Sequence, residues 1–188
     1  VVELLEPVEH GAGQRGVDRV TRDGGNAFVE GHADATPFHR AAWLNGVAKG
    51  TRNRALVLGL EQGGALTAVL PFLEVRSALF GRVLVSSGFG VGGGVLGTNP
   101  GDPDILFSAA EAEAARRSTS TIELRGGPLP HGRAGWTVCH ESHCGYTAGL
   151  AADDEAQLAW VPRKQRAEVR KGLAADLVVT VGNAAADR

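Results

Sequence analysis

The sequence predicts a mixed α/β domain in which helices flank a central sheet. Three β-rich runs, at 55–61, 66–75 and 83–87, follow one another without a helical segment between them. This succession does not fit a simple alternation of strand and helix. Patterns typical of helices precede and follow the three runs, over 36–50 and 102–117. A meander of strands enclosed by helices indicates a mixed sheet with helices packed against it.

The first part of the chain is expected to supply one strand, a loop and a helix. Residues 17–22 predict a short strand, and 23–34 predict a loop because three glycines fall within them. Thr36 and Pro37 then provide an N-cap and a first-turn proline. Apolar residues continue at helical spacing as far as Gly50.

Glycine and proline mark the connections in the middle of the chain. Gln62-Gly63-Gly64 predicts a hairpin between the first two β-rich runs, and 79–81 predicts a turn before the third. A glycine-rich loop is expected over 88–97. Asp102 and Pro103 then supply a cap and a first-turn proline for an alanine-rich helix.

The last third is expected to contain short strands and one interrupted helix. The alternation of Ile122 and Leu124 with Glu123 and Arg125 predicts a strand with one apolar face. The other expected elements are a loop over 126–135, a weak strand over 146–150, a helix over 153–171 broken at Pro162, and a final strand over 177–181.

Composition narrows the class of protein. The 188 residues carry a net charge of -2, with 43% hydrophobic and 21% charged residues, as in an ordinary globular domain. The balanced charge gives no general attraction to nucleic acid or membrane. No apolar run approaches the roughly 20 residues of a membrane-spanning helix, and 1–9 lack the basic region of a signal peptide. We therefore expect a cytoplasmic location.

The glycine loop is the first candidate for chemistry. Gly88-Phe-Gly90-Val-Gly92-Gly93 matches the spacing G-x-G-x-x-G of dinucleotide-binding proteins. That motif requires a helix at its end, whereas the next helical pattern begins only near Pro103, so a dinucleotide site is a remote alternative. A loop of this kind still lets backbone N–H groups approach a ligand closely. A wide turn without a ligand is the competing interpretation.

A basic helical face is the second candidate. Arg163, Arg166 and Arg170 fall at i, i+3 and i+7, with Lys164 and Lys171 beside them. Such a face can bind a phosphate-bearing substrate. It can equally be a solvated charged surface.

The remaining candidates are weaker. Cys139, His140, His143 and Cys144 have metal-ligating side chains, but their spacing is too tight for a common zinc site, so we expect a surface loop and no metal. Glu123 could act as a general base toward an amine, or form a surface pair with Arg125. His39 is open to the same two interpretations. No Ser/His/Asp, HExxH or Walker pattern is present.

Several sequence blocks together resemble one family. They are Ala35–Leu44 (ATPFHRAAWL), 70–81 (LPFLEVRSALFG), Leu84-Val-Ser86-Ser87, Ile122-Glu123-Leu124-Arg125 and 161–172 (VPRKQRAEVRKG). In this order they resemble FemAB-type proteins, and among them the branch associated with exosortase/PEP-CTERM exopolysaccharide systems. The chain departs from the pattern in two places. Its loop is richer in glycine and lacks an aromatic tyrosine near Gly92, and Gly50-Thr-Arg-Asn-Arg54 replaces a Gly-His stretch.

The resemblance implies a GNAT-like fold and an N-acyltransferase or aminoacyltransferase of peptidoglycan or exopolysaccharide synthesis. It implies no tightly bound cofactor, and an acyl donor, aminoacyl-tRNA or acyl-CoA, as co-substrate. The expected partner is a phosphate-bearing envelope precursor. Residues 1–34 would be a lead-in, and 35–188 the first of two GNAT-like domains, the second expected in the same protein. The alternative is a non-catalytic anion-binding half. Under this hypothesis Glu123 is the catalytic candidate, and the substrate-binding candidates are Arg76, Gly92, Gly93, Arg163, Lys164, Arg166 and Arg170.

Overall fold

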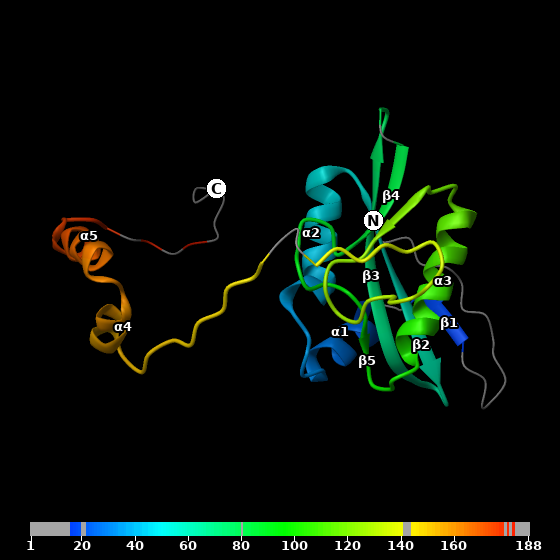
Figure 1. Ribbon diagram of the computed structural model, residues 1–188, viewed down its shortest axis with the longest axis horizontal. Helices are drawn as coiled ribbons and strands as arrows, with labels where there is room; N and C mark the ends of the chain where they lie inside the picture. The colour runs from blue at the N-terminus through cyan, green and yellow to red at the C-terminus, as the bar shows by residue number, and fades with distance from the viewer. Residues whose placement is uncertain are drawn as a thin grey trace. The chain divides into compact units, whose positions relative to one another are not determined.

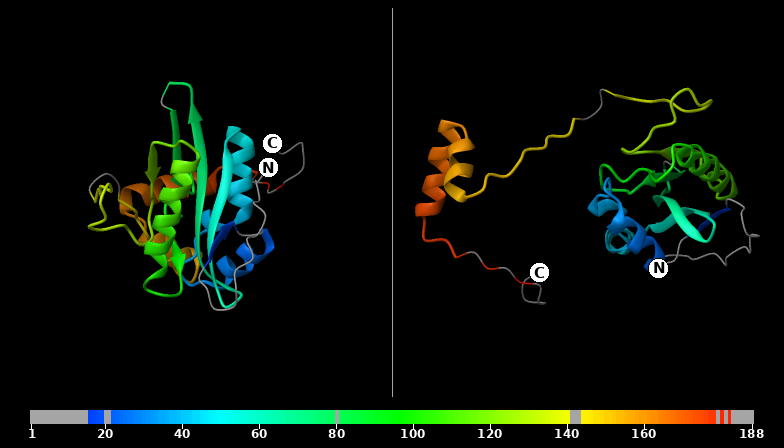
Figure 2. Two further views of the ribbon diagram at one scale, coloured as in Figure 1. Left: turned by 90° about the vertical axis from the view of Figure 1, so that its right-hand side faces the viewer. Right: turned by 90° about the horizontal axis from the view of Figure 1, so that it is seen from below.

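The computed structural model describes residues 16–19, 22–79, 81–140, 144–178, 180 and 182. The chain divides into two compact units, Val1–Val138 and Cys139–Arg188. The first unit contains a sheet with helices on both of its faces, and the second contains two helices (Figures 1 and 2).

Six strands form the sheet of the first unit. Their order is β1-β2-β3-β4-β6, with β5 also paired to β3. Every pair is antiparallel except β4 with β6, which is parallel. The predicted mixed α/β class with a central sheet flanked by helices is therefore confirmed. The strands are β1 Gly16–Arg19, β2 Arg54–Gln62, β3 Ala65–Ser77, β4 Gly81–Ser86, β5 Leu96–Gly97 and β6 Thr121–Glu123.

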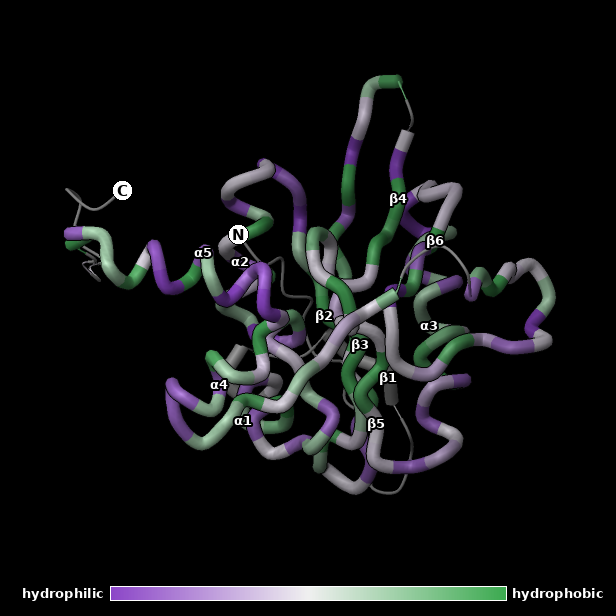
Figure 3. Tube along the Cα trace, turned by 60° about the vertical axis from the view of Figure 1, so that its left-hand side comes forward, coloured by the Kyte–Doolittle hydropathy of each residue, from purple (hydrophilic) through white to green (hydrophobic). Residues whose placement is uncertain are grey.

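Strand β3 separates two apolar layers because its side chains alternate between the two faces of the sheet. Leu70 and Phe72 pack with the core residues of helix α3, Asp102–Arg116. Leu73 faces the other way and packs against Leu44 of helix α2, Ala41–Thr51. Figure 3 shows the apolar residues concentrated along β2, β3 and β4. Full burial of each large apolar side chain contributes about 1.5–3 kcal/mol, so this central strand dominates the stability of the unit.

The segment expected to be a loop over 23–34 is instead helix α1, Arg22–Gly31, so this prediction was wrong. Each glycine inside a helix costs about 1 kcal/mol relative to alanine, which is why the sequence favours a loop. Burial offsets this cost, since Val29 packs against Val69 and Leu96. The side chain of Asn26 also accepts a hydrogen bond from the backbone of Ala41 at 3.1 Å, which ties α1 to α2.

The other elements of the first unit follow the prediction with local differences. The expected helix over 36–50 divides into a 3-10 turn, η1 Pro37–His39, and α2, because Arg40 is extended. The hairpin at 62–64 is confirmed, and Gly63 and Gly64 both have positive φ. Asp102 lies inside the first turn of α3 and binds Asn99, while Gly101 takes the cap position.

The second unit contains helices α4, Asp154–Trp160, and α5, Arg163–Ala174. The predicted break at Pro162 is confirmed, and Asp153 caps α4 by accepting from the backbone N–H of Ala156 at 2.7 Å. The strand expected over 146–150 is absent: these residues are exposed and pair with no strand. Leu177 and Val178 are not in a strand either, while 179 and 181 lie outside the described residues.

Two further observations complete the fold. Within the part of the chain that the structure describes, no helix has the length and apolar character needed to cross a bilayer. The helix after the glycine loop begins at Asp102 and not at Gly93, as the sequence predicts. The loop therefore lacks the helix N-terminus that a dinucleotide-binding motif requires.

Candidate functional site

The glycine loop fills a break in the sheet beside β3. Strand β4 pairs with β3 as far as Phe72, and β5 resumes the pairing on Val69 and Ala68. The break falls at Pro71, which has no N–H to donate to a neighbouring strand. The carbonyl of Pro71 accepts from the backbone N–H of Ser87 at 3.2 Å, where the chain leaves the sheet. Residues 88–95 then cross the gap.

Close packing explains why this loop consists mainly of glycine. A Cβ on Gly90 would lie 2.5 Å from the ring of Phe38, and one on Gly94 would lie 1.8 Å from the carbonyl oxygen of Gly126. The N–H of Gly92 donates to the carbonyl of Arg125 at 3.0 Å. The loop is thus enclosed between η1 on one side and 125–127 on the other, and we define these contacts as its two supports.

Thr36 and His39 form the first support through a set of hydrogen bonds. The hydroxyl of Thr36 donates to the carbonyl of Gly92 at 3.0 Å. The backbone N–H of Thr36 donates to His39 Nδ1 at 3.0 Å, so Nδ1 has no proton and Nε2 carries it. His39 Nε2 can therefore donate to the carbonyl of Gly94, 3.1 Å away. His39 is a buried structural histidine that fixes the loop.

Burial lowers the pKa of His39, although its hydrogen bonds to Gly94 and Thr36 oppose the change. The neutral imidazole is the form that fits, because a proton on Nδ1 would face the N–H of Thr36. The support is consequently intact when His39 is neutral.

Two non-glycine residues of this region adopt left-handed backbone conformations. Ser87 has φ 48° and Phe89 has φ 64°. For a bulky residue such as phenylalanine this conformation is a genuine outlier, and such strain is concentrated at functional sites. Phe89 is also 63% exposed, and Val91 is exposed beside it. The rigid loop therefore presents two apolar side chains outward.

The backbone of the loop supplies donors. Among the described residues, no acceptor is found for the N–H groups of Gly93 and Gly94, although both residues are buried. Buried N–H groups without a partner are rare in proteins, and each needs an explanation. An oxygen of a bound ligand would satisfy them.

The hydroxyls of the two serines next to the loop form hydrogen bonds with backbone groups. The hydroxyl of Ser86 accepts from the N–H of Arg125 at 2.7 Å, and the hydroxyl of Ser87 donates to the carbonyl of Phe38. Among the described residues neither hydroxyl is paired with a base, the arrangement that activates a serine nucleophile.

Glu123 lies next to the loop. It is opposite Val85 in the register of β6 with β4, two residues before Ser87. Its carboxylate accepts from Nε of Arg125 at 2.6 Å, and both side chains are exposed. The structure thus brings together three residues predicted from the sequence, namely Glu123, Gly92 and Gly93.

Arg76 is not part of this group. It lies opposite Arg82, whereas Phe72 lies opposite Ser86, so four residues of β3 separate Arg76 from the loop, about 13 Å at 3.3 Å per residue.

The candidate residues of α5 belong to the second unit. Arg166 there donates to the carbonyls of Ala159 and Val161, at 2.7 and 3.0 Å from Nη2, and so closes the end of α4. For Arg163, Lys164 and Arg170 the described residues offer no ion pair.

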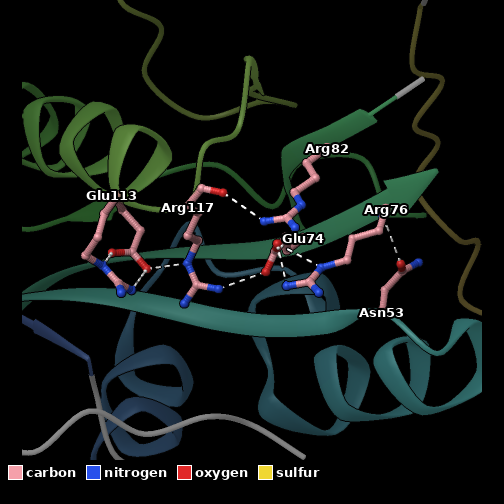
Figure 4. A network of polar contacts seen from close by, with 7 residues as sticks. Asn53, Glu74, Arg76, Arg82, Glu113 and Arg117 are labelled. Carbon is pink, nitrogen blue, oxygen red and sulfur yellow. Dashed lines mark hydrogen bonds and ion pairs between the residues drawn. The ribbon is translucent and has the colours of Figure 1, made fainter. Parts of the chain in front are cut away.

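The sequence does not reveal a network of charged residues beneath the end of α3 (Figure 4). Glu74 has no exposed surface, yet Arg117 and Arg76 contact its two oxygens from opposite sides, each at 2.8 Å. Arg117 also binds Glu113, and Nη1 of Arg82 donates to the carbonyl of Arg117 at 3.0 Å. Period-2 alternation does place Glu74 on the same face as Phe72, which is the only signal of its burial in the sequence.

Glu113 is an acid of this network with a perturbed pKa. Burial alone would raise the pKa of its carboxyl, but hydrogen bonds from Arg116 and Arg117 outweigh this and lower the pKa to about 2. The ionised form of Glu113 is therefore part of the native structure at neutral pH.

Cys139 and Cys144 are free and exposed. Within the described residues no group of three metal-ligating side chains comes together. His143 lies outside these residues.

No protein family model matches the chain, and no curated protein matches it. Solved structures with a similar fold include a ribosomal-protein-alanine N-acetyltransferase from Brucella melitensis biovar Abortus 2308 (14% identity, 67% of this chain, 96% of that one, TM-score 0.40). A GNAT family acetyltransferase from Staphylococcus aureus is 12% identical over 72% of this chain and 98% of its own, with a TM-score of 0.41. A transcriptional regulator from Bacillus halodurans C-125 is 14% identical over 73% of this chain and 100% of its own, with a TM-score of 0.45. These sequence identities and TM-scores are too low to assign an activity to the chain.

Proposed function

We propose that this chain is an N-acyltransferase of the GNAT kind, which transfers an acyl group from a thioester or ester donor to an amine. The observation that carries the proposal is the pair of buried N–H groups of Gly93 and Gly94, for which the described residues offer no acceptor, in a loop fixed on both sides. Donors of this kind stabilise the oxyanion that forms when an amine attacks an acyl carbonyl. Their rigid placement means that little reorganisation is needed during the reaction.

The proposed reaction needs no covalent intermediate. The lone pair of a neutral amine attacks the acyl carbon, a C–N bond forms, and the C–S or C–O bond of the donor breaks. The proton lost by the amine goes to a base and finally to the leaving group. Glu123, the one carboxylate among the predicted site residues, lies on β6 opposite Val85 of β4, and we assign it the role of base. The engaged hydroxyls of Ser86 and Ser87 agree with direct transfer.

The exposed side chain of Phe89 has a role in this proposal. It stands on the same loop as the N–H groups, and its backbone is held in a strained conformation. We assign it to contact with the apolar part of the acyl donor. It replaces, on the same loop, the aromatic residue that the FemAB-type pattern carries near Gly92.

The finer part of the proposal follows the FemAB-type resemblance. The acceptor would be an amine of a phosphate-bearing precursor of peptidoglycan or exopolysaccharide, and the donor an acyl-CoA or aminoacyl-tRNA. Arg163, Lys164 and Arg170 would bind phosphates of these substrates, because they have no ion pair among the described residues. A second GNAT-like domain in the same protein would complete the enzyme.

Titration calorimetry with acetyl-CoA, together with mass spectrometry of an amine acceptor incubated with acetyl-CoA or aminoacyl-tRNA, tests the proposal. Phe89→Ala should weaken donor binding at least tenfold. Leu79→Ala is the control, because Leu79 is another exposed apolar residue and lies in the turn between β3 and β4. Binding without transfer would favour the non-catalytic anion-binding half. Stabilisation by a dinucleotide alone would exclude acyl transfer.

A further inference from the structure

The network around Glu74 contains more arginines than carboxylates. Strand residues Arg76 and Arg82 lie at this end of the sheet, and Arg116 and Arg117 end helix α3. Together with Glu74 and Glu113 these four arginines make a group of six charged side chains with a net charge of +2. The positive charges of Arg116 and Arg117 are stabilised by the negative end of the helix dipole and by Glu113. The strand arginines require another explanation.

Arg76 and Arg82 face each other directly in the antiparallel ladder of β3 and β4. Both point to the face of the sheet that α3 covers, because Arg76 follows Glu74 by two residues. Like charges directly opposite each other in a sheet are destabilising. Among the described residues Arg82 makes no ion pair, and its hydrogen bond goes to a neutral carbonyl. Glu74 pairs with Arg76, but among the described residues no carboxylate pairs with Arg82, so positive charge remains in excess at this pair.

Each guanidinium of the pair is held by one contact that leaves other N–H groups available. Arg76 uses Nε and Nη2 for Glu74, and its side chain is 42% exposed. Arg82 uses Nη1 for the carbonyl of Arg117, and the residue is exposed. Figure 4 shows the two side chains approaching from neighbouring strands. The guanidinium edges that these contacts leave unused can donate to the oxygens of a phosphate group, which accepts from guanidinium in a bidentate manner.

We propose that Arg76 and Arg82 form a binding site for a phosphate group. A phosphate dianion between the two guanidiniums would neutralise the like-charge pair, so the ligand and the sheet end stabilise each other. The site is about 13 Å from the glycine loop along β3, at about 3.3 Å per residue. It does not depend on acyl transfer, and either proposal can fail without the other.

The test is a titration with inorganic phosphate, followed through the Nε–Hε resonances of arginine in nuclear magnetic resonance spectra. Saturable shifts of Arg76 and Arg82 are expected. Arg82→Glu should weaken the affinity at least tenfold, and Arg82→Lys should weaken it less, because the charge remains while the fork is lost. Lys49→Glu is the matched charge reversal, because Lys49 is exposed on α2, which packs on the opposite face of the sheet. The affinity of Lys49→Glu for phosphate should stay within twofold of that of the original protein.

Thermal unfolding supplies a second measurement, since a ligand of the native state raises Tm. Phosphate should raise Tm of the original protein and of Lys49→Glu, but not of Arg82→Glu, whose fold is checked by circular dichroism. The proposal is overturned if phosphate does not saturate, if Arg82→Glu binds as well as the original, or if acetate binds as tightly. Shifts confined to the amides of 88–94 would also overturn it.

Discussion

Replacing Arg117 by methionine should destabilise the first unit strongly. The side chain of Arg117 is 9% exposed, and its guanidinium bridges Glu113 and Glu74, which has no exposed surface. Methionine keeps much of the apolar stem and removes the charge. Glu74 would then lose one of its two ion pairs among the described residues and keep the one with Arg76, while Glu113 would keep its ion pair with Arg116. Removing one partner of a buried ion pair costs about 3–5 kcal/mol, because a buried charge loses its compensation. The remaining arginines lead us to expect a loss near the lower limit, about 3 kcal/mol.

Urea denaturation followed by tryptophan fluorescence and circular dichroism measures this loss. With a slope of about 1–3 kcal/mol per molar urea, the midpoint should fall by roughly 1–3 M. The double variant Glu74→Gln with Arg117→Met should lose less stability than the sum of the losses in the two single variants. The difference, which is the coupling free energy of the two residues, should be about 1–3 kcal/mol. Glu123→Ala is the control, because the pair with Arg125 is exposed and should contribute less than about 1 kcal/mol. A loss below 1 kcal/mol in Arg117→Met, or additive effects in the double variant, would refute the role assigned to this network.

Three further predictions concern single residues. Stability should be complete above pH 4.5 and should decrease as the pH falls toward 2, since the pKa of Glu113 is lowered from 4.5 to about 2 in the native state. Glu113 contributes at most about 3 kcal/mol to this pH-dependent part of the free energy of unfolding. In acid unfolding, the stability of Glu113→Gln should therefore decrease less over the same pH range. The lowered pKa of His39 also makes the protein less stable as the pH falls, but over a higher pH range. Its contribution is complete above 6.5 and is lost as the pH falls below 6.5 toward the native pKa, so His39→Gln should flatten the stability profile there; an unchanged profile would contradict this. Phe89→Asn should raise the free energy of unfolding by about 0.5–1 kcal/mol, because asparagine tolerates the left-handed conformation. The same variant should lose donor binding, and a variant that is less stable would show that Phe89 is not strained.

Most of the sheet could be predicted from the sequence because its signals are local. Alternating apolar residues and the Gly63-Gly64 turn define β2 and β3 without reference to the rest of the chain. Helix α1 could not be predicted, since its glycines favour a loop, whereas the contacts that favour the helix are distant in the sequence: Val29 is buried against β3 and β5, and Asn26 binds the backbone of Ala41. The strand expected over 146–150 failed for the opposite reason. Its residues have some β propensity, but no neighbouring strand pairs with them.

The candidate site shows the same division between local and distant information. The glycine loop is visible in the sequence because close packing requires glycine at Gly90 and Gly94. Its two supports are not visible, since His39 lies 55 residues from Gly94 in the chain. The resemblance gives Arg76 as a substrate-binding candidate, but the register of β3 and β4 places it near the C-terminal end of β3, away from the loop.

The middle of β3 and its C-terminal end therefore differ in the kind of group they can bind. At Pro71 the strand loses a neighbour, and the loop in the gap presents N–H dipoles without a full charge, which suits a carbonyl oxygen that becomes negative during a reaction. At Arg76 the strand end presents fixed guanidiniums, which suit an oxygen that is already charged. Because one rigid strand connects both, a variant that loosens the Glu74 network should change phosphate binding while the supports at Thr36 and His39 keep the loop in place. Comparing Arg117→Met with His39→Gln in both binding assays separates the two sites.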